Sequence, residues 1–349
     1  HTVRPMKNAQ INIAVVGATG AVGREFLDVL QQRRVPRERL RLLASARSAG
    51  STLPYDGSTL PVEELKESSF VGVKLALFSA GGSTSRALAL KAAAAGAVVI
   101  DNSSAWRSDP DVPLVVAEVN PEALRDIPKG IVANPNCTTM AAMPVLKPLH
   151  EAAGLKRLIA STYQAVSGGG MAGVEELHEQ IVAGAAGSDA LARDGSAVDL
   201  GQPRKWAVPI GFNVVPLNYV LGEDGYTEEE TKLRDESRKI LDLPDLTVSG
   251  TCVRVPVFTG HALSMNVEFN RPISVAEALR LLGSAPGVVV TDVPNPLEAT
   301  GKDPVFVGRV RNDPTVAHGL ALFVVGDNLR KGAALNAVQV AEVLLEQAR

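Results

Sequence analysis

The residue in this sequence best suited to nucleophilic chemistry is Cys137, one of only two cysteines. It follows a short apolar run at residues 130–133 and a turn built on Asn134 and Pro135. Residues 138–149 are predicted to form a helix, so the thiol lies where the helix dipole and unpaired backbone N–H groups favour the nucleophilic thiolate. A lone cysteine is more often a small buried hydrophobic residue. Here the polar neighbours and the strand-to-helix turn favour a nucleophile.

Two further side chains suited to chemistry belong to a pair of long apolar segments, residues 247–258 and 262–269, and the short turn that joins them. His261 falls in the short turn between them, and histidine exchanges protons near neutral pH. Most lone histidines are structural, but no other histidine of the chain has a comparable setting. Arg254 interrupts a valine-rich run, where it either faces solvent or binds a carboxylate with its forked guanidinium.

A glycine pattern near the N-terminus predicts a dinucleotide site. The segment is Gly17-Ala18-Thr19-Gly20-Ala21-Val22-Gly23, and it lies between a predicted strand at residues 11–16 and a helical pattern. Glycines let the backbone approach a pyrophosphate, and a helix N-terminus supplies N–H donors. The alternative is a tight turn with no ligand, but the position at the start of a βαβ unit favours the dinucleotide.

The end of the second predicted strand, residues 39–44, favours NADP over NAD. An NAD enzyme usually places Asp or Glu there for the ribose hydroxyls, whereas this chain has Ser45, Arg47 and Ser48 and no carboxylate. Arg47 is suited to pair with a 2′-phosphate, and the two serines are suited to hydrogen bond to it. The alternative is an arginine exposed on the surface.

A helix capping pattern occurs at Thr227-Glu228-Glu229-Glu230. In the helix that follows, Glu229 and Lys232 lie on one face because they are three residues apart. By itself this pattern is most simply a solvated ion pair.

The order of apolar segments predicts two domains with different sheets. Residues up to about 135 alternate short apolar runs with helical patterns, which predicts βαβ units and a Rossmann-type parallel sheet. Beyond Cys137, long strands joined by short turns predict a mostly antiparallel sheet. The fold class is therefore α/β. We assign a dinucleotide-binding domain to residues 6–135, completed by a helix at 328–349, and an α+β catalytic and dimerisation domain to residues 136–327.

The composition of the 349-residue chain narrows the classes of partner. With 46% hydrophobic and 21% charged residues and a net charge of −3, we expect neither a nucleic-acid nor a membrane partner. The two cysteines are far apart, and no cluster of Cys or His predicts a metal site. We therefore expect a reducing, cytoplasmic location. Residues 1–5 are interpreted as a tag remnant.

Taken together, these segments resemble the aspartate-β-semialdehyde dehydrogenase family over nearly the whole chain. Any one motif is weak evidence for the family, but so many motifs in the same order are not expected by chance. The resemblance is carried by residues 17–23, 45–48, 101–107, 134–139, 164–168, 259–261 and 325–330, together with Glu229, Lys232 and Arg254.

The resemblance implies a role for each matched residue. Cys137 is the acylated nucleophile, His261 is the acid/base catalyst, and Gln164 positions the intermediate. The implied substrate contacts are Arg254 for the α-carboxylate, Glu229 for the α-amino group, Arg107 and Lys232 for the phosphate, and Asn136 beside the nucleophile. The implied contacts of the nicotinamide half of the cofactor are Ser167, Gly168 and Asn328. Glu228 and Glu230 leave the assignment of Glu229 open by one residue in either direction.

The implied reaction is the NADPH-dependent reductive dephosphorylation of L-aspartyl-4-phosphate to L-aspartate-4-semialdehyde through a cysteine thioester. It serves the biosynthesis of lysine, threonine and methionine, and the family resemblance implies a homodimer or a homotetramer. The nearest alternatives are N-acetyl-glutamyl-phosphate reductase and glyceraldehyde-3-phosphate dehydrogenase, whose substrates lack the free α-amino group that needs an acidic partner such as Glu229. A non-catalytic dinucleotide sensor needs neither Cys137 nor His261. A cysteine hydrolase leaves the glycine segment and Arg47 without a role.

Overall fold

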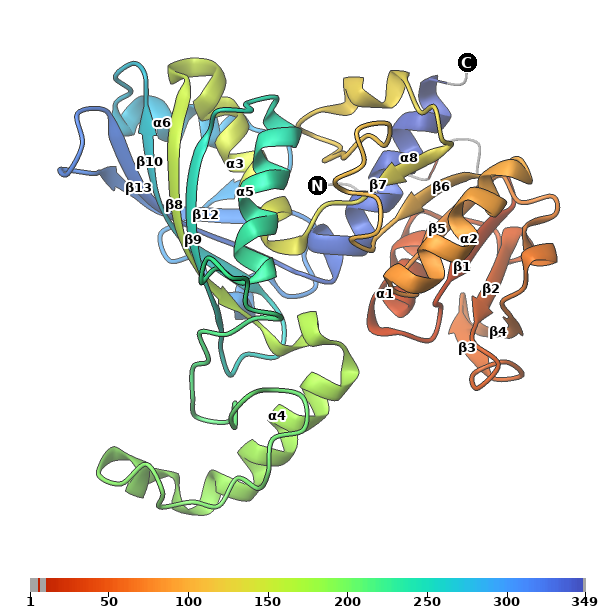
Figure 1. The fold of residues 1–349 in the computed structure, drawn as a ribbon, viewed down its shortest axis with the longest axis horizontal. Helices are drawn as coiled ribbons and strands as arrows, with labels where there is room; N and C mark the ends of the chain where they lie inside the picture. The colour runs from red at the N-terminus through yellow and green to blue at the C-terminus, as the bar shows by residue number, and fades with distance from the viewer. Residues whose placement is uncertain (1–5, 7–10, 348–349) are drawn as a thin grey trace. The chain divides into compact units, whose positions relative to one another are not determined.

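The computed structural model describes residue 6 and residues 11–347, so the predicted tag remnant and the last two residues of the predicted C-terminal helix lie outside the described residues. The chain divides into two compact units (Figure 1). The first contains the described residues of His1–Pro144, Asp235–Pro244 and Leu329–Arg349, and the second contains Val145–Arg234 and Asp245–Asn328. This grouping places residues 235–244 with the first unit, a return of the chain that the sequence-based domain boundaries do not include. Those boundaries stay a prediction.

The first unit is built on a seven-stranded sheet in the order β3-β4-β2-β1-β5-β6-β7. The strands are β1 Ile13–Val16, β2 Leu40–Ala44, β3 Thr52–Tyr55, β4 Ser58–Glu64, β5 Leu75–Phe78, β6 Val98–Asp101 and β7 Ile131–Ala133. Every neighbouring pair is parallel except the hairpin of β3 and β4. The predicted Rossmann-type parallel sheet is confirmed, and the hairpin is an addition that the apolar pattern did not predict.

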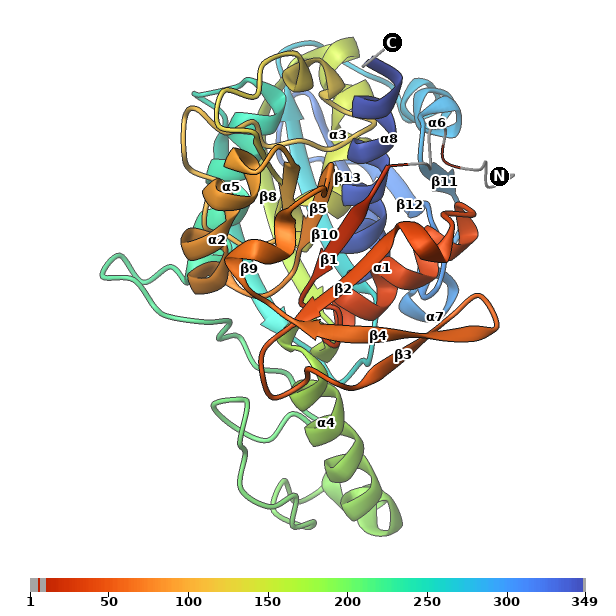
Figure 2. The same cartoon turned by 90° about the vertical axis from the view of Figure 1, so that its right-hand side faces the viewer.

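The helices α1 Ala21–Gln32, α2 Gly82–Ala94 and α8 Leu335–Gln347 cover this sheet. Helices α1 and α8 pack against each other on one face, and α2 packs against β5, β6 and β7 on the other (Figure 2). Leu335, Val338 and Ala341 of α8 are buried in the same apolar cluster as Val15 and Phe26. The predicted packing of the C-terminal helix on the first unit is therefore confirmed.

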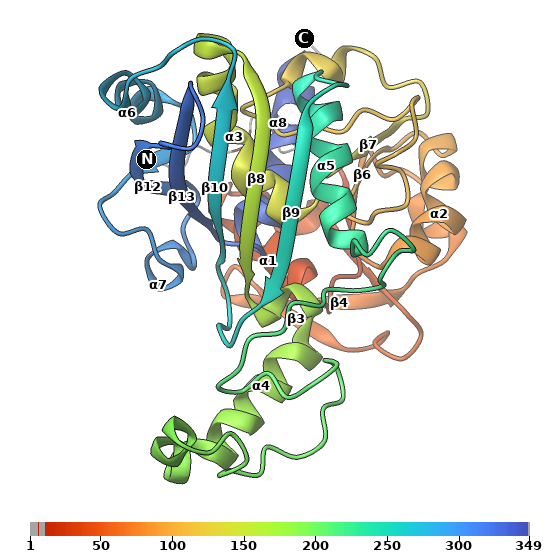
Figure 3. The ribbon, with the colours of Figure 1, turned by 60° about the vertical axis from the view of Figure 1, so that its left-hand side comes forward.

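The second unit is built on a six-stranded sheet in the order β11-β12-β13-β10-β8-β9 (Figure 3). The strands are β8 Leu155–Gln164, β9 Thr247–Arg254, β10 His261–Phe269, β11 Val288–Val290, β12 Val305–Asn312 and β13 Gly319–Gly326. The pairs β10/β13, β10/β8 and β12/β13 are antiparallel, and β11/β12 and β8/β9 are parallel. The predicted mostly antiparallel sheet is confirmed.

Two strand ends differ from the prediction and place functional side chains. Strand β9 ends at Arg254, four residues before the predicted end at residue 258, because Pro256 has no N–H to donate to a ladder. Strand β10 begins at His261, so the histidine is the first residue of a strand rather than part of the preceding turn. Both side chains therefore lie at strand ends, where the backbone of the sheet holds them.

Helix α4, Met171–Gly184, begins a long segment of the second unit that extends beyond the end of β8 (Figure 3) and is back at the sheet by Val215, which pairs with Arg254 of β9. The remaining α-helices of the described residues are α3 Cys137–Ala153, α5 Glu228–Leu241, α6 Val275–Ser284 and α7 Pro296–Ala299. Helices α3 and α5 both cross the boundary between the two units. Within the described residues, no helix combines the length and the apolar character that crossing a bilayer requires.

Candidate functional site

Cys137 is the first residue of α3, at the end of the turn that follows β7. The preceding residue caps the helix: the Asn136 side-chain oxygen accepts a hydrogen bond from the Thr138 amide at 2.9 Å, and its backbone carbonyl accepts from Met140 at 2.8 Å. Asn136 and Thr138 are buried, whereas Cys137 is partly exposed. The sulfur therefore lies at the N-terminus of a capped helix, as the sequence predicted, and its residue is partly exposed.

A buried amide network holds the turn before the cysteine. The Asn134 side chain donates to Asn102 Oδ1 at 2.8 Å and to the Ala333 carbonyl at 3.0 Å. It accepts from Asn336 Nδ2 at 2.7 Å, and Asn336 also donates to the Val115 carbonyl. Because buried amides cost free energy unless they are hydrogen bonded, this network favours one conformation of the turn.

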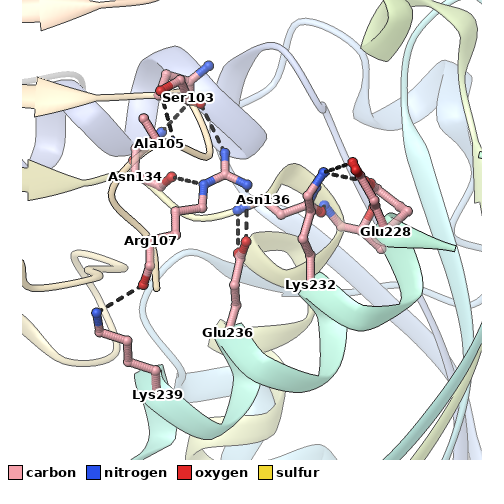
Figure 4. A network of polar contacts seen from close by, with 12 residues as sticks. Ser103, Ala105, Arg107, Asn134, Asn136, Glu228, Lys232, Glu236 and Lys239 are labelled. Atoms are coloured by element: carbon pink, nitrogen blue, oxygen red, sulfur yellow. Dashed lines mark hydrogen bonds and ion pairs between the residues drawn. The ribbon is translucent and has the colours of Figure 1, made fainter. Parts of the chain in front are cut away.

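Arg107 lies beside this turn, and Glu236 links the Arg107 side chain to the backbone of Asn136, the residue before the cysteine (Figure 4). The Arg107 guanidinium donates to the Asn134 carbonyl at 2.9 Å, to the Asn102 carbonyl at 3.0 Å and to Glu236 Oε1 at 3.0 Å. The second oxygen of Glu236 accepts from the Asn136 amide at 2.6 Å. Glu236 is only 4% exposed, so this carboxylate sets the position of a cation and of the residue before the nucleophile together.

Lys239, one turn further along α5, fixes the loop that carries Arg107 (Figure 4). Its ammonium group donates to the backbone carbonyls of Arg107, Asp109 and Val112 at 2.7–2.9 Å. Burial lowers the pKa of Lys239, and the charges of Asp109 and Glu236 act in the opposite direction. The loop is thereby tied to α5 by three charge-assisted hydrogen bonds.

In the second unit, a chain of side-chain hydrogen bonds runs from Arg254 to Glu229. Arg254 Nε donates to Asn218 Oδ1 at 3.1 Å, and Asn218 Nδ2 donates to Gln164 Oε1 at 3.0 Å. Gln164 Nε2 then donates to Glu229 Oε1 at 2.9 Å, and Thr162 donates to the Gln164 oxygen at 3.0 Å. Arg254 is 1% exposed, which contradicts the alternative in which it faces solvent. A buried cation and a buried carboxylate are thus held by one connected set of amides.

The three consecutive glutamates at the start of α5 separate into different environments. Glu228 is exposed, whereas Glu229 is 2% exposed and contacts Gln164. Glu230 completes the predicted capping box with Thr227, at 2.7 and 3.4 Å, and also accepts from the Cys252 amide. The expected ion pair of Glu229 with Lys232 is present, but it is not solvated on the Glu229 side, because that carboxylate is buried against Gln164. Lys232 lies 3.6 Å from Glu228 and 3.9 Å from Glu229.

His261 is buried and held by the backbone of the loop after β8. Its Nδ1 accepts a hydrogen bond from the Ala165 amide at 3.0 Å, so the neutral ring carries its proton on Nε2. Burial, and secondarily the positive charge of Arg254, hold the pKa of His261 well below its usual value of 6.5. No hydrogen-bond partner of Nε2 exists among the described residues. The neutral histidine therefore presents an N–H donor that the protein itself does not satisfy.

Gly168 leaves a small space beside Arg254 and His261. A Cβ atom at this position would lie 3.0 Å from Arg254 Nη1 and 3.1 Å from His261 Nε2. Both nitrogens thus border the position where any other residue would place its side chain. A cation and an N–H donor facing one small space are suited to bind a carboxylate and a carbonyl oxygen of the same ligand.

Ser167 and Asn328, both predicted to contact the cofactor, are brought together by the fold. Asn328 Nδ2 donates to the Ser167 hydroxyl at 2.9 Å, and Asn328 Oδ1 accepts from the Gly260 amide at 2.9 Å. The Thr259 hydroxyl also contacts Ser167, at 3.2 Å. The loop after β8, the turn before His261 and the end of β13 are therefore linked side by side.

The glycine segment of the first unit has the geometry of a phosphate cradle. Gly17 has φ +83°, and a Cβ there would lie 2.3 Å from the Ser79 carbonyl; a Cβ at Gly23 would lie 2.2 Å from the Gly17 carbonyl. Within the described chain no group accepts a hydrogen bond from the amides of Ala21, Val22 or Gly23, the first residues of α1. These donors and the helix dipole fit a dinucleotide pyrophosphate. Thr19 and Gly20 complete the turn, with Gly20 as the helix N-cap.

Arg47 lies in the turn after β2 and is exposed. It forms no ion pair with any described residue, and the adjacent Ser45 carbonyl accepts from the Ser48 amide at 2.9 Å, which closes the turn. The side chain is therefore available to a ligand at the carboxyl end of the sheet, where open α/β sheets bind cofactors.

The predicted site residues divide between the two units. The first unit holds Gly17, Thr19, Gly20, Ala21, Val22, Gly23, Ser45, Arg47, Ser48, Arg107, Asn136 and Cys137. The second holds Gln164, Ser167, Gly168, Glu229, Lys232, Arg254, His261 and Asn328. Among the described residues, no group of three His, Cys, Asp or Glu side chains is placed to hold a metal ion.

Sequence reasoning missed several polar residues of these networks. Glu236 had a signal, since it follows Glu229 and Lys232 at i+7 and i+4 on the same helix face. Trp206, whose ring centroid lies 4.8 Å from the centre of the Arg254 guanidinium, had a weaker signal, as one of only two tryptophans. Asn218 had none, because it lies in an irregular segment without periodicity and binds a residue 54 positions away.

Comparison with known proteins assigns both units to one family. Residues 12–127 match the family model described as the NAD binding domain of semialdehyde dehydrogenase, and residues 146–331 match its dimerisation domain. The chain is 59% identical over 336 residues to the aspartate-semialdehyde dehydrogenase of Streptomyces akiyoshiensis, covering 96% of this chain and 98% of the relative. It is 56% identical over 343 residues to that of Mycolicibacterium smegmatis, with 96% and 99% covered.

Solved structures agree. The crystal structure of aspartate semialdehyde dehydrogenase II from Vibrio cholerae, complexed with ASA, matches with a TM-score of 0.91 and 44% identity, covering 97% of this chain and 99% of that one. The Candida albicans aspartate semialdehyde dehydrogenase with NADP matches with a TM-score of 0.70 and 26% identity over 97% and 99% of the two chains.

Proposed function

The chain belongs to the aspartate-semialdehyde dehydrogenase family, and from that premise we propose that it reduces L-aspartyl-4-phosphate to L-aspartate-4-semialdehyde, a step toward lysine, threonine and methionine. The observation that carries the proposal is the pair of preformed sites. One is Cys137 at a capped helix N-terminus beside Arg107. The other is the buried Arg254–Asn218–Gln164–Glu229 chain.

The substrate is an α-amino acid, and the second unit offers a group for each of its charges. Arg254 is a forked cation suited to the α-carboxylate, and Glu229 is a carboxylate suited to the α-ammonium group. Gln164 lies between them and donates to Glu229, so it orients the acid and positions the bound intermediate. An N-acetylated glutamyl substrate has no α-ammonium group, so the buried Glu229 would have no cation of the ligand to pair with.

The reaction proceeds through sulfur. The Cys137 thiolate attacks the acyl carbon of the substrate, the bond from that carbon to the phosphate oxygen breaks, and a thioester remains. Arg107 and Lys232 are the proposed partners of the departing phosphate, and the positive end of the α3 dipole beside Asn136 stabilises the oxyanion. A bound nicotinamide dinucleotide supplies the hydride that reduces the thioester. His261 Nε2–H then hydrogen bonds to the alkoxide of the thiohemiacetal, whose collapse releases the aldehyde and regenerates the thiolate.

The test is phosphate-dependent reduction of NADP by the purified protein with L-aspartate semialdehyde. The proposal expects turnover that requires phosphate and that falls sharply when N-acetyl-glutamate semialdehyde or glyceraldehyde 3-phosphate is offered instead. Preference for either of these would move the protein to another phosphorylating aldehyde dehydrogenase. NADPH binding without turnover on any of the three would favour the non-catalytic sensor.

We propose that the nicotinamide dinucleotide this protein uses is NADP rather than NAD, and that Arg47 binds its 2′-phosphate. Replacing Arg47 with Glu is expected to raise the Kd for NADPH by about 10- to 100-fold, because a charge-assisted contact contributes about 1.5–3 kcal/mol, and to leave the Kd for NADH nearly unchanged. Fluorescence titration of the reduced cofactors measures both constants. Arg37, which is also exposed in the first unit, is the control: Arg37→Glu makes the same change of charge and is expected to alter neither. An unchanged NADPH to NADH ratio in the Arg47 variant would remove the role.

We further propose that the chain forms a homodimer, or a dimer of dimers, through the open face of the second sheet. Ile159 and Tyr163 of β8 are 40% and 41% exposed, and the Tyr163 ring lies 5.9 Å from that of Phe323 on β13. An exposed apolar sheet face of this kind is typical of a subunit interface.

Replacing Tyr163 with Glu is expected to shift the assembly to a monomer, because it buries a charge in that interface. Light scattering after size exclusion measures the mass. Val71→Glu, at an equally apolar but separate position that is 73% exposed, is expected to leave the mass unchanged. A Tyr163 variant that keeps the mass of the unmodified protein would place the interface elsewhere.

We infer a cytoplasmic location, since both cysteines carry thiols. A reducing compartment keeps a nucleophilic thiol from oxidising.

A further inference from the structure

Trp206 lies in the segment between α4 and α5 and contacts the proposed carboxylate-binding arginine. The centre of the Arg254 guanidinium lies 4.8 Å from the centroid of the Trp206 ring. We propose that Trp206 is a positioning residue for the substrate α-carboxylate, which it serves by holding the Arg254 guanidinium in the plane that binds the ligand. This inference rests on the proposed function, because the role of Arg254 in carboxylate binding is part of that function.

The hydrogen bonds of Arg254 leave it only partly constrained. Its Nε donates to Asn218 and its Nη1 donates to the Ala165 carbonyl at 2.7 Å. Nη2 makes no hydrogen bond to any described residue, and Nη1 retains a second proton. The remaining donors, on Nη1 and Nη2, form the edge of the guanidinium to which a carboxylate would bind with two hydrogen bonds. The indole face closes one side of the plane and attracts the cation through its ring quadrupole.

The backbone around Trp206 is shaped to accept this ring. A Cβ at Gly169 would lie 2.6 Å from Trp206 Cη2, and a Cβ at Gly173 would lie 2.8 Å from Cζ2. Neither glycine has a positive φ that would by itself require glycine. Trp206 also packs against the small apolar cluster of Val166, Leu177, Ile210 and Val215. The ring is therefore wedged between the glycine loop after β8 and this cluster, with Arg254 on its face.

In this arrangement the neighbouring glycines of the loop after β8 have different functions. Gly168 opens the space in which Arg254 and His261 meet a ligand, and Gly169 admits the ring that backs Arg254. Because the carboxylate is distant from the reacting carbon, its contact with Arg254 is present in both the ground state and the transition state. Loss of such a contact raises KM and leaves kcat nearly unchanged.

The experiment compares Trp206→Leu with Trp206→Phe. The leucine variant is expected to raise KM for L-aspartate semialdehyde by about 3- to 30-fold, the range that a cation–π contact covers. Its kcat and its KM for NADP are expected to stay within about twofold. Phe keeps an aromatic face, so it is expected to restore KM to within about threefold of the unmodified protein. Val208→Ala, an exposed position on the same segment, is the control for a general destabilisation of this segment. It is expected to leave kcat and both KM values unchanged.

Two kinetic results would overturn the inference while leaving the proposed function intact. One is an unchanged KM for L-aspartate semialdehyde in Trp206→Leu. The other is a parallel change in kcat, both KM values and Tm that Phe does not rescue, since that would mark a purely structural residue.

A second readout needs no turnover. Trp106→Phe leaves Trp206 as the only tryptophan of the chain, and its emission is titrated with L-aspartate semialdehyde in the absence of NADP and phosphate. We expect a saturable change that Arg254→Leu removes. A saturable change in a protein without turnover would support the role of Trp206 and contradict the proposed reaction. No change in a protein that turns over would contradict only the role of Trp206, and neither response nor turnover would overturn both.

Discussion

Replacing Cys137 with serine is expected to abolish turnover, with kcat reduced about a thousandfold or more. The serine hydroxyl stays protonated near neutral pH and is a far weaker nucleophile than a thiolate, and an ester is a poorer substrate for reduction and release than a thioester. Phosphate-dependent NADP reduction measures the loss. The proposed cofactor site lies on the glycine segment and the turn after β2, so the Kd for NADPH is expected to be unchanged.

The fold is also expected to survive this replacement. Cys137 is partly exposed, and the residues that shape its turn are Asn134, Asn136 and Glu236. The matched control is Cys252→Ala, which removes the other thiol. Cys252 is buried in β9, as the sequence predicted, so this variant is expected to lose some stability and to keep its turnover. Activity that persists in Cys137→Ser would contradict the covalent route.

His261→Ala is expected to lower kcat by about 10²- to 10⁴-fold, the range for loss of a positioned proton donor. The reason is the preformed donor: Nδ1 is occupied by the Ala165 amide, so the neutral ring carries its proton on the otherwise unsatisfied Nε2. His178, which is exposed on α4, is the control, and His178→Ala is expected to keep full activity. Equal activity of the two variants would remove His261 from the mechanism.

The same histidine gives a pH dependence whose sign follows from its environment. Burial and Arg254 hold the pKa of His261 well below 6.5 in the folded protein, whereas in the unfolded chain it returns to about 6.5. Between those values the unfolded state binds the extra proton. The stabilising contribution of the neutral ring is therefore complete above pH 6.5 and is lost as the pH falls below it.

Urea unfolding at pH 7.5 and pH 5.5 measures this contribution. The unmodified protein is expected to lose about 1 kcal/mol more than His261→Gln over this interval, because glutamine does not titrate. The plot of kcat against pH is also expected to show no loss of activity near pH 6.5 from protonation of His261. Equal pH dependence in both proteins would show that His261 titrates normally when folded.

Local patterns were enough to predict several features of this protein. The strand, turn and helix around Cys137, the glycine turn before α1 and the capping box of α5 each depend on residues within a few positions of one another. The periodicity of apolar residues also predicted a parallel sheet followed by a mostly antiparallel one. These features follow from backbone geometry and short-range hydrogen bonding, which a single segment of sequence contains in full.

Other features are decided by contacts between distant segments. Glu236 reaches the Asn136 amide across 100 positions, and Asn218 reaches Gln164 across 54. The burial that separates Glu229 and Glu230 from the exposed Glu228 depends on how α5 packs beside β9, not on the capping pattern in which all three occur. The ring of Trp206 contacts Arg254 in a space that Gly169 and Gly173 leave open, because a Cβ atom at either glycine would clash with the ring.

The sequence by itself thus determined which residue types are present for the chemistry and which local elements carry them. The tertiary structure decided which of these side chains share an environment: the tautomer of His261, the burial of Arg254 and Glu229, and the pairing of Arg107 with Glu236. The physical reason is that burial and hydrogen-bond partners are properties of packing between segments, and side chains that face one another across a fold leave no periodic trace along the chain.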